Sequence, residues 1–259
     1  NMNAYFEGNS YQVIDRTDIP KQDVMFENVW GVADEVLFAH ALRTLEKRHA
    51  DGSPFFAHIM TTSNHRPYTY PDGRIDIPSP GGRDGAVKYT DYAIGQFLDK
   101  ARSQSWFKDT LFIITADHCA SVAGKSKLPV AGYHIPLIFY APGLIKPDTF
   151  DTRVSQIDLA PTIVELFGKK GDDHFFGRSF FEHGDALKRV FISNYQSLGY
   201  WRNDTLTVLL PKGQVESYQV DPKTLATTPA PIDPRLLDET IAYYQSASRA
   251  FKAGALVNK

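Results

Sequence analysis

The apolar positions of the chain fall into short runs of strand length and longer segments with helical spacing. Residues 33–49 and 86–104 repeat apolar positions every three or four residues, which indicates amphipathic helices. This alternation is typical of an α/β fold in which a mostly parallel sheet is sandwiched by helices. The strand-like runs of the predicted sheet are residues 11–14, 55–61, 110–115, 135–140 and 190–195.

A third helix, expected over residues 159–167, has clear end signals. Asp158 can act as its N-cap, and Pro161 falls in the first turn, where no backbone donor is needed. Gly168 can close its C-terminus.

The C-terminal part of the chain has a different pattern. Strand-like runs at residues 206–210 and 215–220 are separated by Pro211-Lys212-Gly213, which predicts an antiparallel hairpin. A last helix, over residues 234–253, is expected to pack back over the sheet. We therefore expect residues 1–185 to form the main α/β region. Residues 186–259 add antiparallel strands and a terminal helix that either complete this domain or are appended to it.

Composition narrows the functional classes. Of the 259 residues, 42% are hydrophobic, enough to build a sizeable core. The formal net charge of -2 comes from 28 basic and 30 acidic residues spread along the chain, which argues against a nucleic-acid partner. No apolar run approaches the roughly 20 residues of a membrane span. Cys119 is the only cysteine, so an intramolecular disulfide is excluded. The expected partner is a small molecule or a lipid headgroup.

The first candidate site follows the apolar run 111–114, which leads into Thr115-Ala116-Asp117-His118. Open α/β sheets bind ligands beyond the C-terminal ends of their strands. A carboxylate and a neutral imidazole suit a divalent ion, which would need two or more further ligands. Adjacent strand residues point to opposite faces, so Asp117 and His118 can share an ion only if the chain has turned out of the strand. The structural alternative is that Asp117 caps a turn and His118 packs beside it.

Two further candidates follow or precede strand-like runs. Ser63-Asn64-His65-Arg66 offers hydroxyl, amide, imidazole and guanidinium groups at one strand end, a set suited to a phosphate or sulfate. A polar turn ending at Pro67, with His65 and Arg66 solvated, fits these residues equally well. His134 stands just before residues 135–140, where a lone histidine is more often structural than a ligand.

Taken together, these segments resemble the lipoteichoic-acid-synthase-like sulfatase domains of the alkaline phosphatase superfamily. The resemblance covers residues 1–181, and the order of the motifs is more specific than any single motif. The matching segments are Trp30-Gly31-Val32-Ala33-Asp34, Ser63-Asn64-His65-Arg66-Pro67-Tyr68, Tyr89-Thr90-Asp91, Phe112-Ile113-Ile114-Thr115-Ala116-Asp117-His118, His134-Ile135-Pro136-Leu137 and Asp158-Leu159-Ala160-Pro161-Thr162.

The resemblance implies a role for each candidate. Asp117 and His118 are expected to bind a catalytic divalent cation, for which Mn is our first expectation and Mg, Zn or Ca are alternatives. His65 is expected to contact the phosphoryl or sulfuryl group of the substrate and to assist proton transfer. Arg66 and His134 are the other expected substrate-binding residues. We expect His65 to open onto the same cleft as the Asp117–His118 pair.

The chain departs from the family in one respect. The family's nucleophile lies N-terminal to every motif seen here, together with another acidic metal ligand. It is a Thr in lipoteichoic acid synthases and a Cys or Ser modified to formylglycine in sulfatases. Cys119 does not map onto it and is expected to be a small packed thiol. The resemblance therefore implies that residues 1–185 are the C-terminal part of a catalytic domain, incomplete by itself.

The implied function is a metal-dependent phosphoglycerol- or phosphoethanolamine-type transferase that acts on envelope lipids or glycans. The alternative enzyme is a sulfatase, and the identity of the nucleophile would separate the two. An alternative of another class is a metal-free, lipid-binding regulatory module, against which the intact Asp117–His118 pair argues. By analogy with bacterial members of the family, we expect the parent protein to be anchored in the cytoplasmic membrane by upstream spans. Its catalytic domain is then expected on the periplasmic or extracellular face.

Overall fold

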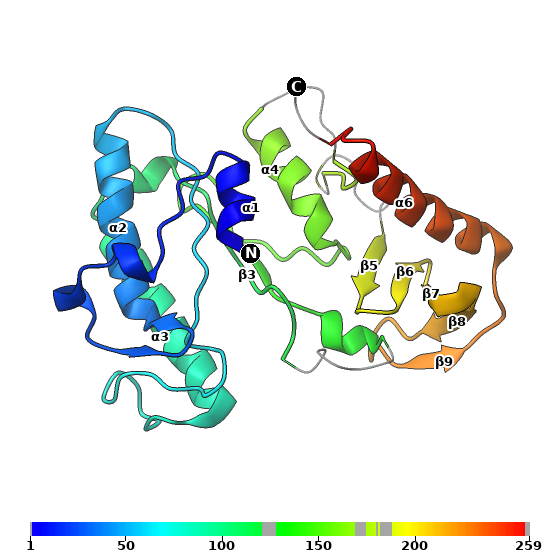
Figure 1. The fold of residues 1–259 in the computed structure, drawn as a ribbon, viewed down its shortest axis with the longest axis horizontal. Helices are drawn as coiled ribbons and strands as arrows, with labels where there is room; N and C mark the ends of the chain where they lie inside the picture. Colours follow the sequence, from blue (N-terminus) through cyan, green and yellow to red (C-terminus); the bar gives the residue numbers. More distant parts are fainter. Residues whose placement is uncertain (1, 121–127, 169–174, 180, 182–187, 257–259) are drawn as a thin grey trace. The chain divides into compact units, whose positions relative to one another are not determined.

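The computed structural model describes residues 2–120, 128–168, 175–179, 181 and 188–256. Its α-helices are α1 (Met2–Gly8), α2 (Asp34–Ala50), α3 (Gly82–Ala101), α4 (Leu159–Leu166) and α6 (Pro234–Lys252) (Figure 1). Its strands are β1 (Glu27–Asn28), β2 (Gly31–Val32), β3 (Phe112–Thr115), β4 (Leu137–Tyr140), β5 (Arg189–Ser193), β6 (Leu198–Arg202), β7 (Thr205–Leu209), β8 (Val215–Val220) and β9 (Thr227–Pro229).

The chain divides into two compact units. Unit 1 comprises Asn1–Leu111 and Ala141–Ile145, and unit 2 comprises Phe112–Tyr140 and Lys146–Lys259. The predicted division between residues 1–185 and 186–259 stays a prediction.

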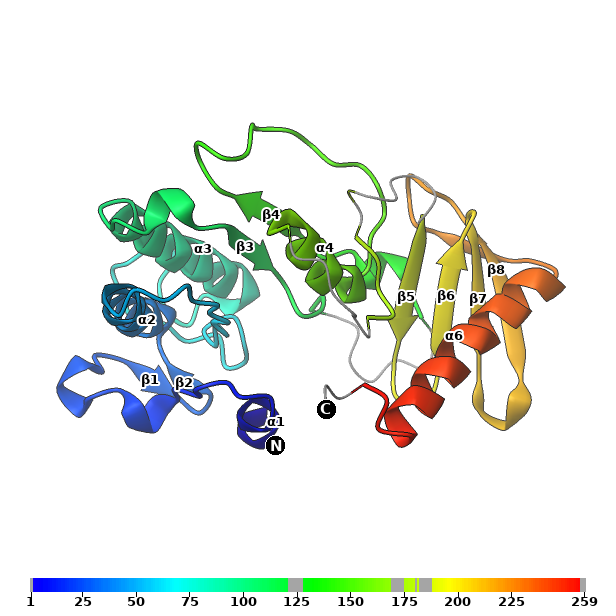
Figure 2. The same ribbon diagram turned by 90° about the horizontal axis from the view of Figure 1, so that it is seen from above.

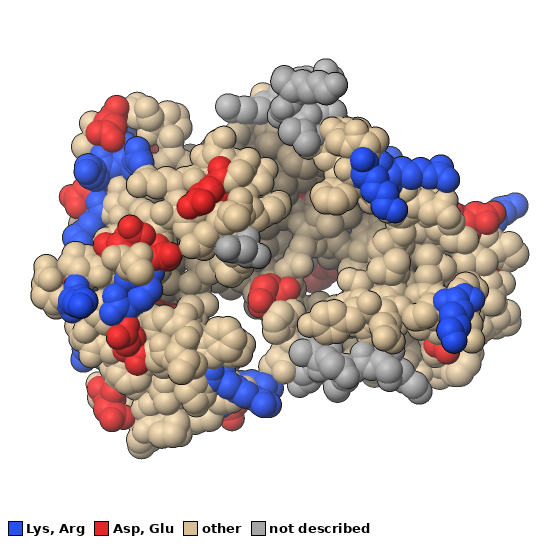
Figure 3. Space-filling view, viewed as in Figure 1, with Lys and Arg blue, Asp and Glu red and all other residues tan. Residues whose placement is uncertain are grey.

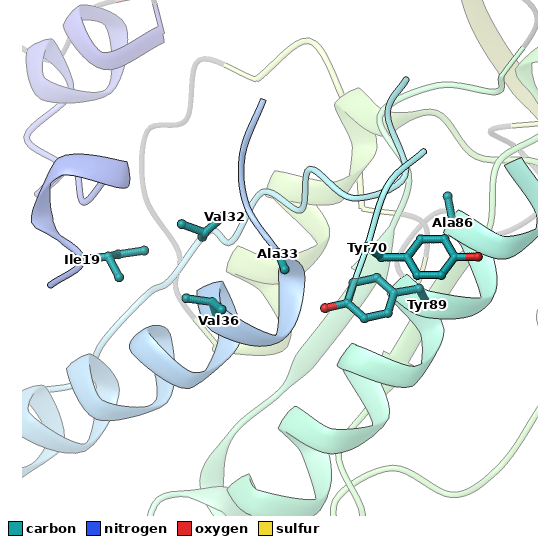
Figure 4. Close-up of a cluster of buried hydrophobic side chains, with 7 residues drawn as sticks. All are labelled: Ile19, Val32, Ala33, Val36, Tyr70, Ala86 and Tyr89. Atoms are coloured by element: carbon teal, nitrogen blue, oxygen red, sulfur yellow. The ribbon is translucent and has the colours of Figure 1, made fainter. Parts of the chain in front are cut away.

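Unit 1 is built around α2 and α3, which run side by side in both ribbon views (Figures 1 and 2). Tyr89, Ala93 and Phe97 recur every four residues along α3, so they share one buried face. Phe97 stacks on Phe38 of α2 with ring centroids 5.0 Å apart, and Tyr89 stacks on Tyr70 at 5.2 Å. The adjoining buried cluster, drawn in Figure 4, consists of Ile19, Val32, Ala33, Val36, Tyr70, Ala86 and Tyr89.

Helices α2 and α4 carry local sequence signals at their ends. The first turn of α2 carries Asp34 and Glu35, and its last turn carries Lys47, Arg48 and His49, an arrangement that complements the helix dipole. Gly168 ends α4 with a positive φ of 64°, and its N–H donates to the carbonyl oxygen of Glu165 at 2.8 Å. The helices predicted over residues 33–49, 86–104, 159–167 and 234–253 are thus confirmed as α2, α3, α4 and α6.

Asp158 does not cap α4 through its side chain, which corrects the expectation for this residue. Its carboxylate accepts hydrogen bonds from the backbone N–H groups of Ser155 (3.1 Å) and Arg178 (2.9 Å). It also pairs with both terminal nitrogens of Arg189, at 3.2 and 2.9 Å. Both side chains of this ion pair are only 2% exposed. A buried guanidinium needs a carboxylate partner, and this demand directs the Asp158 side chain away from the helix terminus.

Unit 2 contains a five-stranded antiparallel sheet in the order β5-β6-β7-β8-β9, with α6 lying against it (Figure 2). Asn203 and Asp204 connect β6 to β7 with φ angles of 48° and 60°, as a two-residue hairpin turn requires. The predicted hairpin of β7 and β8 is confirmed. So is the packing of the last helix, since the Tyr244 hydroxyl of α6 donates to the Gly199 carbonyl oxygen of β6 at 3.0 Å.

The α/β class is confirmed, but the strand direction is not as expected. Every strand pair among the described residues is antiparallel, including β3 with β4, where Ile113 lies opposite Phe139. Parallel neighbours require a long crossover, which is usually a helix. The described part of the connection between β3 and β4 holds only the short 3-10 helix Val130–Tyr133, so the chain returns antiparallel.

Two of the predicted strands are absent. Residues 11–14 and 55–61 have no strand partner within the described ranges, and the Phe56 side chain is 67% exposed. A strand needs a neighbour to satisfy its backbone groups, so an apolar run alone does not make one.

Across the described ranges, no helix combines the length and apolarity needed to cross a membrane. On the face drawn in Figure 3, Lys and Arg side chains lie among Asp and Glu side chains.

Candidate functional site

Asp117 and His118 lie just beyond the end of β3, in a bend that takes the chain out of the strand. Asp117 Oδ2 and His118 Nε2 are 3.5 Å apart, and the two side chains are 80% and 60% exposed. Consecutive strand residues would point to opposite faces, so the bend is what brings both side chains to one side. The pair can therefore reach a single ion from solvent.

The hydrogen bonds of the bend orient the imidazole. The backbone N–H of His118 donates to Asp117 Oδ1 at 2.8 Å. His118 Nδ1 lies 2.8 Å from the carbonyl oxygen of Cys119, which can only accept, so we assign the proton to Nδ1. Nε2 then keeps its lone pair, as a metal-binding imidazole requires.

Two contacts from elsewhere in unit 2 hold this bend in place. Gln156 Nε2 donates to the carbonyl oxygens of Ala116 (3.1 Å) and Asp117 (2.9 Å). Cys119 Sγ donates to the carbonyl oxygen of His134 at 3.2 Å, while the His134 side chain itself is exposed. The structure thus joins Asp117, His118 and His134 in one loop cluster. No sequence motif pointed to Gln156, which is 39 residues from Asp117 along the chain.

The residues of this cluster fit a divalent ion in part. One carboxylate oxygen and one imidazole nitrogen are suitable donors, but a catalytic ion normally has three or more protein ligands. The described residues contain no group of three His, Cys, Asp or Glu side chains able to hold an ion. Asp117 and His118 would supply two ligands, and their role as ligands stays a prediction.

His65 lies in a tight turn of unit 1, and backbone hydrogen bonds form on both sides of it. The backbone N–H of His65 donates to the Thr62 carbonyl oxygen at 3.1 Å, and the His65 carbonyl oxygen accepts from the backbone N–H of Tyr68 at 2.8 Å. The His65 imidazole is exposed and packs against the Trp30 indole, with ring centroids 3.7 Å apart. Trp30 was part of a matching segment in the sequence, but only the structure shows that it contacts His65.

Two arginines, Arg66 and Arg83, lie close to Tyr68 in this turn. Arg83 donates to the Tyr68 hydroxyl at 2.9 Å, and its guanidinium lies 5.7 Å from the centre of the Tyr68 ring. Hydrogen bonding from Arg83, followed by that from Arg66, lowers the pKa of Tyr68. Two cations close to one exposed turn favour an anionic ligand there. This agrees with the expectation that His65 and Arg66 bind a phosphate or sulfate, which stays a prediction.

The predicted site residues are divided between the two units. His65 and Arg66 belong to unit 1, whereas Asp117, His118 and His134 belong to unit 2, and a cleft shared by both sets stays a prediction.

A groove of about 560 Å³ between α6 and strands β6 to β8 is lined by Leu209, Tyr244 and Arg249 among others, and by none of the predicted site residues.

Comparison with known proteins decides the family. The sequence matches the sulfatase family over residues 2–169. The chain belongs to the sulfatase family. A protein of the alkaline phosphatase superfamily from Vibrio parahaemolyticus matches the fold with a TM-score of 0.91 and 33% identity, over 100% of this chain and 64% of that one. The fold of this sulfatase-family chain is therefore that of the alkaline phosphatase superfamily, and the resemblance drawn from the sequence motifs is confirmed.

More distant relatives point the same way. The lipoteichoic acid synthase LtaP of Listeria monocytogenes shares the fold, with a TM-score of 0.68 and 21% identity over 92% of this chain and 62% of that one. Phosphoglycerol transferase I of Escherichia coli O139:H28 is 23% identical over 212 residues, or 77% of this chain. That match covers 27% of the transferase, so the chain spans about a quarter of the length of the curated relatives that it matches.

Proposed function

We propose that this chain is the C-terminal part of the catalytic domain of a metal-dependent transferase, which moves a phosphoglycerol- or phosphoethanolamine-type group onto envelope lipids or glycans. The observation that carries the proposal is the Asp117–His118 bend, whose donor atoms are 3.5 Å apart and whose imidazole leaves Nε2 available. The match to a phosphoglycerol transferase supports the choice of reaction. That relative is matched over 27% of its length, and the order of the sequence motifs supports a nucleophile upstream of this chain.

Each residue has a part in this proposal. Asp117 and His118 would hold the cation, which when bound stabilises negative charge on the phosphoryl oxygens. His65 would contact the transferred group and move a proton to or from the attacking or leaving oxygen. Arg66 would pair with an anionic oxygen of the substrate through charge-assisted hydrogen bonds, and His134 would bind the substrate beside the metal ligands.

The nucleophile would attack phosphorus from the upstream part of the domain as an ionised oxygen and form a covalent phospho-enzyme. The P–O bond to the leaving alcohol breaks as the bond to the nucleophile forms. The leaving oxygen takes a proton, for which His65 is the proposed donor. An acceptor hydroxyl then attacks the phospho-enzyme and passes its proton back to His65 as the bond from phosphorus to the nucleophile oxygen breaks. We place the catalytic domain outside the cytoplasmic membrane, with the parent protein anchored by upstream spans.

The test uses the full-length protein with Mn or Mg, assayed on a chromogenic phosphodiester and on an aryl sulfate. Asp117→Ala and His118→Ala should lower the rate on the phosphodiester at least about 100-fold, with partial recovery at high Mn concentration. His65→Gln should lower it by about 10² to 10⁴ while Mn affinity is kept.

Asp99→Ala and His49→Gln, which replace exposed residues on α3 and α2, are matched controls and should retain full rates. Turnover of the aryl sulfate alone would favour the sulfatase alternative, which the family match makes the second candidate. A protein that binds lipid vesicles but no divalent ion, and turns over neither substrate, would instead be the regulatory module.

A further inference from the structure

One acidic side chain of unit 1 is fully buried and contacts the turn that carries His65. Asp34, the first residue of α2, has an exposed fraction of 0%. Its Oδ1 accepts hydrogen bonds from the backbone N–H groups of Thr62 (2.9 Å) and Ser63 (3.0 Å). Its Oδ2 accepts from the Thr90 hydroxyl of α3 at 2.8 Å. The backbone N–H of Asp34 returns a bond to the Ser63 hydroxyl at 3.1 Å.

The hydrogen bonds of the Asp34 carboxylate do more than stabilise the start of α2. A buried carboxylate is costly unless donors surround it, and here three donors from outside α2 do so. A carboxylate that served the helix alone would accept from the free N–H groups of its own first turn. Asp34 instead ties α2, α3 and the start of the Thr62–Ser63 turn to one point.

The anchor stands two residues before His65. Ser63 is buried, whereas Asn64 and His65 are exposed, so the chain leaves the core immediately after the residue that Asp34 holds. The next backbone bond, from His65 N–H to the Thr62 carbonyl oxygen at 3.1 Å, passes this fixed position on to His65. A displacement of Thr62 and Ser63 would therefore displace the imidazole.

A second contact fixes the ring that this backbone presents. The Trp30 indole lies against the His65 imidazole, with an interplanar angle of 39°. The backbone N–H of Trp30 donates to Asn28 Oδ1 at 2.9 Å, and Asn28 Nδ2 donates to the Thr69 hydroxyl at 3.2 Å. The stack can form only while the His65 backbone stays in register with Trp30. It therefore reports on the Asp34 anchor.

We propose that Asp34 is a positioning residue for His65, which acts by holding the backbone of Thr62 and Ser63. This inference rests on the proposed function, in which His65 contacts the transferred group. A misplacement of about 1 Å in a catalytic group can cost about 100-fold in rate, so a fixed backbone two residues away matters to the reaction. Asp34 itself contacts neither the substrate nor the metal in this proposal.

The test compares Asp34→Ala and Asp34→Asn with a control in the full-length protein. Asp34→Ala removes both carboxylate oxygens, the acceptors for Thr62, Ser63 and Thr90, and should lower kcat on the phosphodiester at least about 10-fold, with KM changed little. Asp34→Asn should lose less, because its amide oxygen still accepts from the Thr62 and Ser63 N–H groups while the Thr90 hydroxyl turns to accept from the amide. The control is Leu45→Ala, which removes a buried side chain of α2 about three helical turns away from Asp34. It should lower stability without lowering kcat.

A second readout does not depend on activity. The His65 ring protons, assigned through His65→Gln, should show an upfield ring-current shift from Trp30 in the NMR spectrum of the full-length protein. The shift should be lost in Asp34→Ala, largely kept in Asp34→Asn and unchanged in Leu45→Ala.

The outcomes separate the two proposals. A lost shift together with a fall in kcat beyond that of Leu45→Ala supports the positioning role. An unchanged shift, or a kcat equal to that of Leu45→Ala, overturns it. If the shift depends on Asp34 but the unsubstituted protein turns over neither substrate, the anchor stands and the proposed function falls.

Discussion

The buried ion pair between Arg189 and Asp158 gives a sharp prediction for stability. Both side chains are 2% exposed, and the two terminal nitrogens of Arg189 bond to both carboxylate oxygens. Arg189→Met fills a similar volume but leaves the carboxylate with only the backbone N–H groups of Ser155 and Arg178. The buried negative charge then has no cation beside it.

The magnitude follows from that loss. Removing one partner of a buried pair typically costs about 3 to 5 kcal/mol, a large part of the roughly 5 to 15 kcal/mol that stabilises a domain. Arg189 Nε is buried and has no hydrogen-bond partner among the described residues, so the native pair is not fully satisfied. We therefore expect a cost near the lower end, about 3 kcal/mol.

Urea unfolding of the full-length protein, followed by circular dichroism, measures this cost. Arg102→Met, which removes the exposed partner of Asp99 (N–O distance 3.5 Å), is the control and should cost under about 1 kcal/mol. The double variant Asp158→Asn with Arg189→Met should be more stable than Arg189→Met alone, because no buried charge is left unpaired. If Arg189→Met costs no more than Arg102→Met, the reasoning from burial is refuted.

Two further predictions concern the metal-site bend and alkaline pH. Gln156→Ala removes both donors to the Ala116 and Asp117 carbonyl oxygens and should weaken Mn binding by the full-length protein about 10-fold in a titration. An unchanged affinity would show that Gln156 does not orient the bend. Burial raises the pKa of Tyr244 from 10.0 to about 12, so the unfolded chain ionises first. The contribution of Tyr244 to the free energy of unfolding should be complete below pH 10 and should be lost as the pH rises towards 12. Urea midpoints compared across that range should therefore fall less steeply for Tyr244→Phe than for the unsubstituted protein. Equal slopes would contradict this.

Local patterns were sufficient for the helices and for one hairpin. The period of apolar residues placed α2 within one residue of its observed bounds, because helical hydrogen bonds close within the segment itself. The Pro211-Lys212-Gly213 turn likewise placed β7 against β8. Strand pairing between distant segments was less accessible. Residues 55–61 have the composition of a strand but lack a partner in the described ranges.

The sequence by itself determined the residue types of the candidate site and the order of the motifs that show the family. It placed Asp117 and His118 at the end of β3, because an apolar run followed by polar residues marks a strand end. Only the tertiary structure decided which groups hold the Asp117 bend and the turn before His65 in place. Gln156 reaches back to the Asp117 bend, and Asp34 reaches forward to the turn before His65, both across long stretches of chain. Such contacts depend on which backbone groups packing leaves unpaired, and no periodicity in the sequence records that.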